Sequence, residues 1–191
     1  YRNNPGKSYV KSMFHAAYRR KVFDTIGGFN EELARTEDNE IHYRMRKAGY
    51  KLCFDPDIIS YQYTRSSLKA MLKQKYANGY WIGKTSKVCP KCLSIYHFVP
   101  FAFVSAIIAS GSVIGATGLA ECIKKRHNHT LGKGISALRK VTVVLTTVMW
   151  VLYALMASGM AAVSAFKAED KRNITNACLP VLFLLLHLSY G

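Results

Sequence analysis

Three long apolar runs constrain the fold of this 191-residue chain more than any other feature of its sequence. They span residues 98–120, 141–166 and 174–191, and none of them contains Asp, Glu, Lys or Arg. Each reaches the roughly 18–20 residues that a helix needs to cross a bilayer core, and buried helices of soluble proteins are seldom so long and uncharged. We therefore expect a membrane region, residues 93–191, with about three hydrophobic spans.

The first 92 residues differ in composition and are strongly basic. They hold 18 Lys and Arg against 8 Asp and Glu, whereas residues 93–191 hold 9 against 3. Positive charge can serve nucleic-acid binding, but no recognition module is visible, and the spans favour membrane lipids as the partner. We therefore expect residues 1–92 to form a basic domain outside the bilayer that binds no nucleic acid.

Residue patterns in this domain predict short helices and strands. Gly27-Gly28 is suited to end a helix with a left-handed cap, Thr36 to begin the next helix as its N-cap, and Gly49 to stop it. Asp55-Pro56-Asp57 is a turn sequence between two alternating segments. The predicted elements are an extended segment 12–18, helices 20–26 and 36–48, and strands 51–54 and 58–63.

A further helix is predicted directly before the membrane region, over about residues 66–84. Its apolar side chains recur at helical spacing and alternate with lysines. A basic amphipathic helix of this kind is suited to lie on an anionic bilayer surface. The apolar stripe comprises Leu68, Met71, Leu72 and Tyr76, and the basic residues include Lys69, Lys73, Lys75 and Lys84.

A concentration of acids marks the start of the predicted helix 36–48. Glu37, Asp38 and Glu40 follow Thr36 in a chain that is otherwise poor in acids. Backbone N–H groups and the helix dipole hold a carboxylate there in a fixed direction. A fixed carboxylate is what a general base for a hydroxyl group requires, although helix stabilisation alone would also explain these acids.

The five cysteines are predicted to be free thiols. Cys89-Pro90-Lys91-Cys92 is a single C-x-x-C motif, and a structural zinc site needs four ligands. The sequence supplies no second pair at the usual spacing, and His97 alone leaves the set incomplete. We interpret Cys89 and Cys92 as reduced thiols near the membrane, with no assigned role.

Several ordered motifs resemble the second half of a family 2 glycosyltransferase. The resemblance is to the membrane-anchored bacterial branch that builds exopolysaccharides of the succinoglycan type. It covers nearly the whole chain and is most specific over about residues 13–100. The motifs are HAAYRR at 15–20, IGGFNE at 26–31, ED at 37–38, YRMRKAGY at 43–50, QKYANGYW at 74–81 and the ending HLSYG at 187–191.

The resemblance implies an α/β fold, the acceptor half of a GT-A glycosyltransferase domain, followed by an all-α transmembrane region. We expect the sheet within residues 13–65 to be incomplete, with strand edges that lack partners. The implied activity is inverting transfer of a sugar from a nucleotide-sugar donor to a lipid-linked saccharide acceptor in bacterial polysaccharide synthesis. The implied location is the bacterial inner (plasma) membrane, multi-pass, with the catalytic part in the cytoplasm.

Matching the motifs residue by residue implies roles for individual side chains. Asp38 is the expected general base, and Glu37 supports it. His15, Tyr18 and Arg19 match a region that lines the acceptor side. Gln74, Gly79 and Trp81 correspond loosely to the family's Gln-x-x-Arg-Trp element, and Trp81 is equally suited to anchor the chain at the membrane interface.

The resemblance also implies a divalent metal, Mg or Mn, held by an Asp-x-Asp motif in the donor half. Asp55-Pro56-Asp57 has these letters but follows Asp38 in the chain, which is the wrong order. We therefore expect the metal ligands to lie outside this chain. The chain is expected to be a fragment that lacks its donor half and is inactive by itself.

Two questions stay open at this level. The chain could instead be a non-enzymatic membrane scaffold or a small transporter subunit with a basic lipid-binding domain, although the apolar runs contain no ionisable residue except His187. Residues 98–120 either cross the membrane as one of three plain spans or form a re-entrant hairpin or bent helix, which Gly111, Gly115 and Gly118 would allow.

Overall fold

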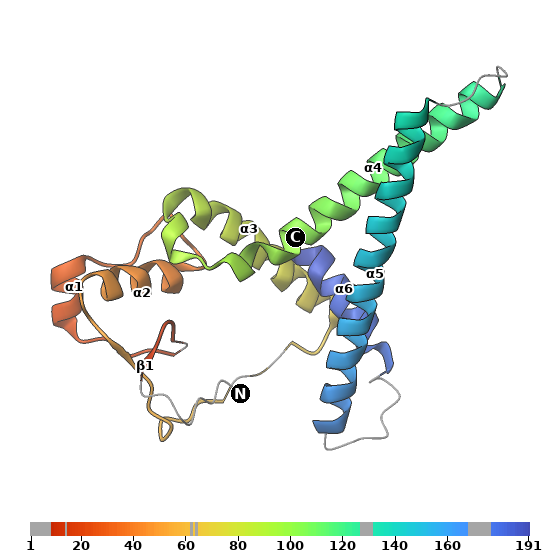
Figure 1. Cartoon of the computed structure of the whole chain (residues 1–191). Coiled ribbons are helices and arrows are strands. Elements are labelled where there is room, and N and C mark those ends of the chain that lie inside the picture. Colours follow the sequence, from red (N-terminus) through yellow and green to blue (C-terminus); the bar gives the residue numbers. More distant parts are fainter. Residues whose placement is uncertain (1–8, 14, 62, 64, 127–131, 168–176) are drawn as a thin grey trace. The chain divides into compact units, whose positions relative to one another are not determined.

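The computed structural model describes residues 9–13, 15–61, 63, 65–126, 132–167 and 177–191 (Figure 1). The chain divides into two compact units, the first essentially Tyr1–Phe98 and the second essentially Val99–Ser189. Each unit is described by itself.

The first unit begins with two short helices that confirm the predicted ones. Helix α1 is Arg20–Ile26 and helix α2 is Glu37–Lys47. Gly27 follows α1 with φ +81°, and its N–H donates to the Phe23 carbonyl at 2.8 Å. Gly49 follows α2 with φ +87°. Positive φ favours glycine, so both helices end where the sequence supplies that residue.

The sheet is smaller than predicted. Strand β1 (Tyr9–Val10) pairs antiparallel with strand β2 (Leu52–Cys53), with Tyr9 opposite Cys53 and Val10 opposite Leu52. These are the strands among the described residues, so the predicted α/β character is weak and the unit is mainly helical.

The predicted strand 58–63 is wrong where the structure describes it, because residues 58–61 and 63 belong to no strand. Residues 12–13 and 15–18 belong to no strand either, so of the predicted strand or extended segment at 12–18 only the extended segment is left; Phe14 and Gln62 lie outside the described residues. The turn at Asp55-Pro56-Asp57 is confirmed, because the Asp57 N–H donates to Asp55 Oδ1 at 3.0 Å. After it, Tyr61 is 93% exposed and Tyr63 is fully exposed. An alternating pattern forms a strand only when a neighbouring strand accepts its hydrogen bonds.

A small apolar core holds α1, α2 and β2 together. Ile41 and Met45 of α2 are 0% and 2% exposed, and they pack with Val22 of α1 and Leu52 of β2. Ile41 and Met45 are four residues apart, so they lie on one helix face. Partly buried side chains surround this group: Val10, Met13, Tyr18, Phe23, Ile26 and Tyr50.

Helix α3 (Leu68–Val88) confirms the predicted helix and extends beyond it. Ser67 caps it, because its hydroxyl oxygen accepts from the Ala70 N–H at 3.3 Å. Ile82 and Thr85 are buried, so the second half of α3 is the half that packs in this unit. Two short 3-10 helices follow, η1 (Pro90–Cys92) and η2 (Ile95–Phe98), and η1 packs against both α2 and α3.

The second unit consists of helices α4 (Val99–Arg126), α5 (Lys133–Lys167) and α6 (Leu179–Tyr190). Of the described segments, Ile95–Arg126 and Lys133–Phe166 are long and apolar enough to cross a membrane. Helix α4 continues through all three of its glycines, so residues 99–120 do not form a hairpin. The choice between a plain span and a bent helix stays a prediction. Helix α6 has 12 residues, about 18 Å of helix, which is too short to span a core of about 30 Å by itself.

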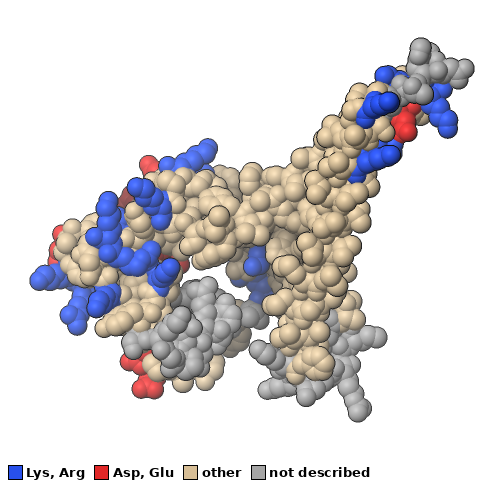
Figure 2. Space-filling view, viewed as in Figure 1, with Lys and Arg blue, Asp and Glu red and all other residues tan. Residues whose placement is uncertain are grey.

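Side chains in this unit are sorted as expected for helices in a bilayer. Figure 2 shows Lys and Arg gathered at one end of α4 and α5, with uncharged residues along the described part of these helices beyond that end. The last turn of α4 is basic, and Arg139 of α5 pairs there with Glu121 of α4. Within the apolar part, His187 Nδ1 lies 2.9 Å from Tyr153 Oη, so this ionisable group has a local polar partner.

The core of the first unit leads to a stability prediction. Met45→Ala should lower the free energy of unfolding by about 2–5 kcal/mol, because it leaves a cavity beside Ile41. Lys47→Ala, at an exposed position of the same helix, should change it by less than about 0.5 kcal/mol. Thermal unfolding of the two variants in detergent would measure the difference. Equal melting temperatures would contradict the assigned core.

Candidate active site at the start of helix α2

The acids at the start of α2 are oriented by Thr36, which has an unusual backbone conformation. Thr36 has φ +64°, in the left-handed region that non-glycine residues seldom adopt. Its hydroxyl does not cap α2 as predicted. It contacts the Thr85 hydroxyl of α3 and the Arg35 carbonyl instead. The N-cap position is therefore correct, but a tertiary contact holds it in place.

A second contact reinforces this junction between α2 and α3. Arg35 Nη1 donates to Asn78 Oδ1 at 3.0 Å, one residue before Thr36. Thr85 is fully buried. Backbone strain of the kind seen at Thr36 persists only where surrounding contacts oppose its release, and it is found most often at functional sites.

Asp38 and Glu37 lie in the first turn of α2 and are partly exposed. Asp38 Oδ1 accepts from the Asn39 N–H at 2.8 Å, which fixes the carboxylate against the helix end. Among the described residues, Glu37 Oε2 is a buried side-chain oxygen without a hydrogen-bond partner. A polar atom of this kind favours a site that binds a hydrogen-bond donor.

Tyr18 is the predicted acceptor-side residue that the structure brings to these acids. Its hydroxyl oxygen lies 2.7 Å from His42 Nε2. Burial raises the pKa of Tyr18, and the nearby charges of Asp38 and Glu37 raise it further. The phenol therefore stays neutral beside the two carboxylates and can donate or accept a hydrogen bond.

Arg44 and Glu40 form an ion pair that the sequence analysis missed. Arg44 Nε lies 2.7 Å from Glu40 Oε1, and Nη2 lies 2.8 Å from Oε2. The same guanidinium donates to the carbonyls of Ile26 at 2.5 Å and Gly28 at 2.6 Å. This clasp ties the loop after α1 to α2. The sequence signal that could have revealed this ion pair is an acid four residues before an arginine in a predicted helix, close to a Gly-Gly loop.

His15 and Arg19 lie in the segment before α1. His15 is exposed, has φ +56°, and its Nδ1 lies 3.1 Å from Ser60 Oγ. Arg19 is exposed and occupies the N-cap position of α1. Their predicted contacts with an acceptor remain predictions.

Gln74, Gly79 and Trp81 lie on α3, on which Asn78 and Thr85 make the contacts described above. Lys84 Nζ lies 5.0 Å from the centre of the Trp81 ring and 5.3 Å from that of Tyr80. Aromatic rings beside a lysine are typical of residues that anchor a protein at the membrane interface.

The C-x-x-C motif packs at the site but has the properties of inert thiols. Cys89 and Cys92 are free, and Cys92 is buried on η1. Burial, the neighbouring Cys89 and then Glu40 raise the pKa of the Cys92 thiol to about 12. Reactivity requires the thiolate, so Cys92 behaves as a small apolar residue.

The described residues contain no group of three or more His, Cys, Asp or Glu side chains that could hold a metal ion. The Mg or Mn ion that the resemblance implies therefore does not fit this part of the chain.

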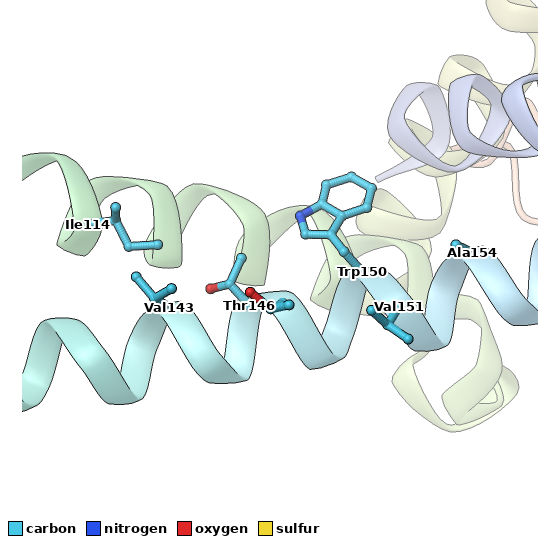
Figure 3. Close-up of a pocket in the computed structure, with 7 residues that line it drawn as sticks. Ile114, Val143, Thr146, Trp150, Val151 and Ala154 are labelled. Atoms are coloured by element: carbon cyan, nitrogen blue, oxygen red, sulfur yellow. The ribbon is translucent and has the colours of Figure 1, made fainter.

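A groove in the second unit differs in chemistry from this site. It lies between α4 and α5 and has a volume of about 390 Å³ (Figure 3). Ile114, Val143, Thr146, Trp150, Val151 and Ala154 line it. None of these six side chains titrates near neutral pH, so they cannot transfer a proton. This groove suits apolar chains and not a reaction centre.

Comparison with known proteins assigns the family. A family profile described as "Glycosyl transferase family group 2" matches residues 15–189. The chain belongs to this family. The predicted resemblance to family 2 glycosyltransferases is thereby confirmed, and the Glu37-Asp38 site lies within the matched glycosyltransferase region.

Two curated relatives are similar to parts of this glycosyltransferase chain. The succinoglycan biosynthesis protein ExoA of Rhizobium meliloti (strain 1021) is 32% identical over 65 residues, 34% of this chain and 20% of the relative. The O-antigen chain rhamnosyltransferase WbaN of Salmonella anatum is 44% identical over 48 residues, 25% of this chain and 15% of the relative. The chain thus covers a fifth or less of each. No solved structure matches it significantly.

The Arg44 clasp leads to a second prediction. Arg44→Gln should lower the free energy of unfolding by about 1–3 kcal/mol, because it leaves the buried Glu40 carboxylate unpaired and frees the loop carbonyls. Arg44→Lys should recover part of this loss, since Lys keeps the charge but not the bidentate geometry. Lys47→Gln is the matched control, and thermal unfolding is the measurement. If Arg44→Gln unfolded like this control, the clasp would not stabilise the unit.

Proposed function

We propose that this chain supplies the acceptor side and the membrane region of an inverting glycosyltransferase. The reaction transfers a sugar from a nucleotide-sugar donor to a lipid-linked saccharide in bacterial polysaccharide synthesis. The observation that carries the proposal is the position of Glu37 and Asp38 at the start of α2, in a chain of glycosyl transferase family group 2. Family membership argues against the scaffold and transporter alternatives.

Asp38 is the proposed general base. Its carboxylate takes the proton from an acceptor hydroxyl while that oxygen bonds to the anomeric carbon of the donor. The bond from this carbon to the nucleoside diphosphate breaks, and the leaving group keeps the electron pair. A single displacement inverts the configuration. Glu37 beside Asp38 supports the acceptor, and its buried oxygen is available for a sugar hydroxyl.

The donor part of the reaction is proposed to depend on residues outside this chain. The chain covers a fifth or less of its two relatives, and its described residues hold no metal-ligand cluster. The proposal therefore assigns no reaction step to a Mg or Mn ion. The names of the relatives, a succinoglycan biosynthesis protein and an O-antigen rhamnosyltransferase, support polysaccharide synthesis but differ in product.

The proposed location is the bacterial inner membrane, multi-pass, with the catalytic part in the cytoplasm, where nucleotide sugars are available. Helices α4 and α5 support membrane insertion by their length and composition. Figure 2 shows Lys and Arg spread over the visible surface of the first unit, as expected for a domain that faces anionic lipid.

The base assignment can be tested in the full-length protein. Asp38→Asn should lower kcat by about 10²–10⁴-fold, because the amide keeps the shape but cannot accept a proton. Glu37→Gln should cost less, because its role is supportive. Rates should be measured across pH with saturating donor. If Asp38→Asn kept more than about a tenth of the wild-type kcat, the base would have to be another residue.

The proposed position of α3 at the membrane leads to a separate test. A peptide of residues 66–88 should bind anionic phospholipid vesicles, and raising the salt concentration should weaken the binding because counterions screen its lysines. Uncharged phosphatidylcholine vesicles are the control. Binding that does not change with salt would contradict the electrostatic part of the proposal.

A further inference from the structure

His42 is a fully buried polar residue in the apolar core of the first unit. It lies between Ile41 and Met45 on α2 and is 0% exposed. Both of its ring nitrogens have partners: Nε2 lies 2.7 Å from Tyr18 Oη, and Nδ1 lies 3.3 Å from Ser12 Oγ. An apolar side chain could fill the same space, so what the imidazole adds at this position is hydrogen bonding.

The position of His42 on α2 connects it to the proposed base. Asp38 and His42 are four residues apart, so their side chains lie one above the other on the same helix face. Asp38 is partly exposed at the helix start, whereas His42 is buried one turn further in. A side chain that binds His42 from another segment therefore lies against the helix face that also carries Asp38.

Tyr18 is that group, and aromatic rings constrain it from several sides. Its ring meets Phe23 edge-on at 5.6 Å and Phe29 edge-on at 6.1 Å, and it lies tilted against His42 at 5.9 Å. The rings fix the plane of the phenol, and the bond to His42 fixes its hydroxyl. Burial raises the pKa of Tyr18, and the negative charges of Asp38 and Glu37 raise it further.

The Tyr18 hydroxyl can make another hydrogen bond in addition to the one with His42, because a phenol can both donate and accept. Burial lowers the pKa of His42, Asp38 opposes this and Arg46 adds to it, so the ring is neutral and carries one N–H. If the phenol donates to Nε2, its oxygen can still accept. If Nε2–H donates to the phenol, the phenolic hydrogen is free to donate.

We propose that His42 is a positioning residue that holds the Tyr18 hydroxyl beside Glu37 and Asp38, where it binds a hydroxyl group of the acceptor saccharide. This inference rests on the proposed function, because the acceptor reaches the site only if Asp38 is its base. Tyr18 contacts the sugar, and His42 acts through Tyr18. The pair fixes the acceptor before its neighbouring hydroxyl loses a proton to Asp38.

The test compares variants of the full-length protein. The acceptor is the detergent-solubilised lipid-linked saccharide extracted from the native membrane, and the donor is the UDP-, GDP- or dTDP-sugar that the wild type transfers. Tyr18→Phe should raise the KM for this acceptor about 2–10-fold, the value of one hydrogen bond, and leave the KM for the donor unchanged. Tyr50→Phe is the matched control, because the Tyr50 hydroxyl donates to Thr25 Oγ1 of α1 at 3.0 Å and has no role in the proposed site. This variant should not alter either KM.

The role of His42 is tested by two replacements. His42→Leu keeps the core apolar but removes the bond, so it should raise the acceptor KM as much as Tyr18→Phe does, and the double variant should be no worse than either single one. His42→Gln supplies a side-chain amide that can donate to or accept from the Tyr18 hydroxyl, and it should return the acceptor KM toward the wild type. A purely structural role would change stability or both KM values and would show no such rescue.

Each outcome decides one statement. An unchanged acceptor KM for Tyr18→Phe overturns the inference even if the His42 variants fail to fold. An additive double variant overturns the positioning role of His42. Asp38→Asn, measured in parallel, separates the two proposals: if it is inactive while Tyr18→Phe binds acceptor normally, only this inference fails, and if it remains active, the base assignment fails.

Discussion

The ion pair between Glu40 and Arg44 is the interaction on which the rest of the first unit depends. Both residues belong to α2, yet the arginine also holds carbonyls of the loop after α1. A guanidinium has five N–H donors in a planar fork, so one side chain can satisfy a carboxylate and several carbonyls together. The loop that it holds carries Phe29, which packs on Tyr18. The packing around Tyr18, on the proposed acceptor side, therefore depends on the Glu40–Arg44 contact.

Helix α2 contributes both to the apolar core and to the proposed reaction centre, because its buried residues and its acids lie at different positions along the helix. Ile41, His42 and Met45 face inward and are buried. The acids of the first turn lie at the helix end, where the dipole and free N–H groups favour negative charge. Thr36 connects this end to α3 through Thr85. A rigid helix with one anchored end can present a carboxylate in a constant direction, as a general base requires.

The two units supply different parts of the proposed activity. The first has acids, hydrogen-bonding groups and a basic surface, while the second is apolar along α4 and α5 and basic at the end where α4 stops and α5 begins. The proposed lipid-linked acceptor has the same division, with a sugar in water and a chain in the bilayer. This correspondence is consistent with the proposed function.

Local features of the fold could be predicted from the sequence. The ends of α1 and α2 at Gly27 and Gly49, the start of α3 and the long apolar helices depend on interactions within a few residues. The acid pair at 37–38 was likewise visible, because a helix start and its acids are adjacent in the chain. Family motifs singled out Tyr18, whose role on the acceptor side stays a prediction.

Contacts between distant residues could not be predicted in the same way. Residues 58–61 alternate like a strand but have no paired neighbour and remain exposed, since sheet hydrogen bonds depend on another segment. Thr36 has the residue type of a helix cap, yet its hydroxyl contacts Thr85, 49 positions away. The Tyr18–His42 bond joins residues 24 positions apart. The sequence by itself determined which residues could form helices, spans and an acid pair; only the tertiary structure decided which side chains meet them, because those bonds depend on how separate segments pack in space.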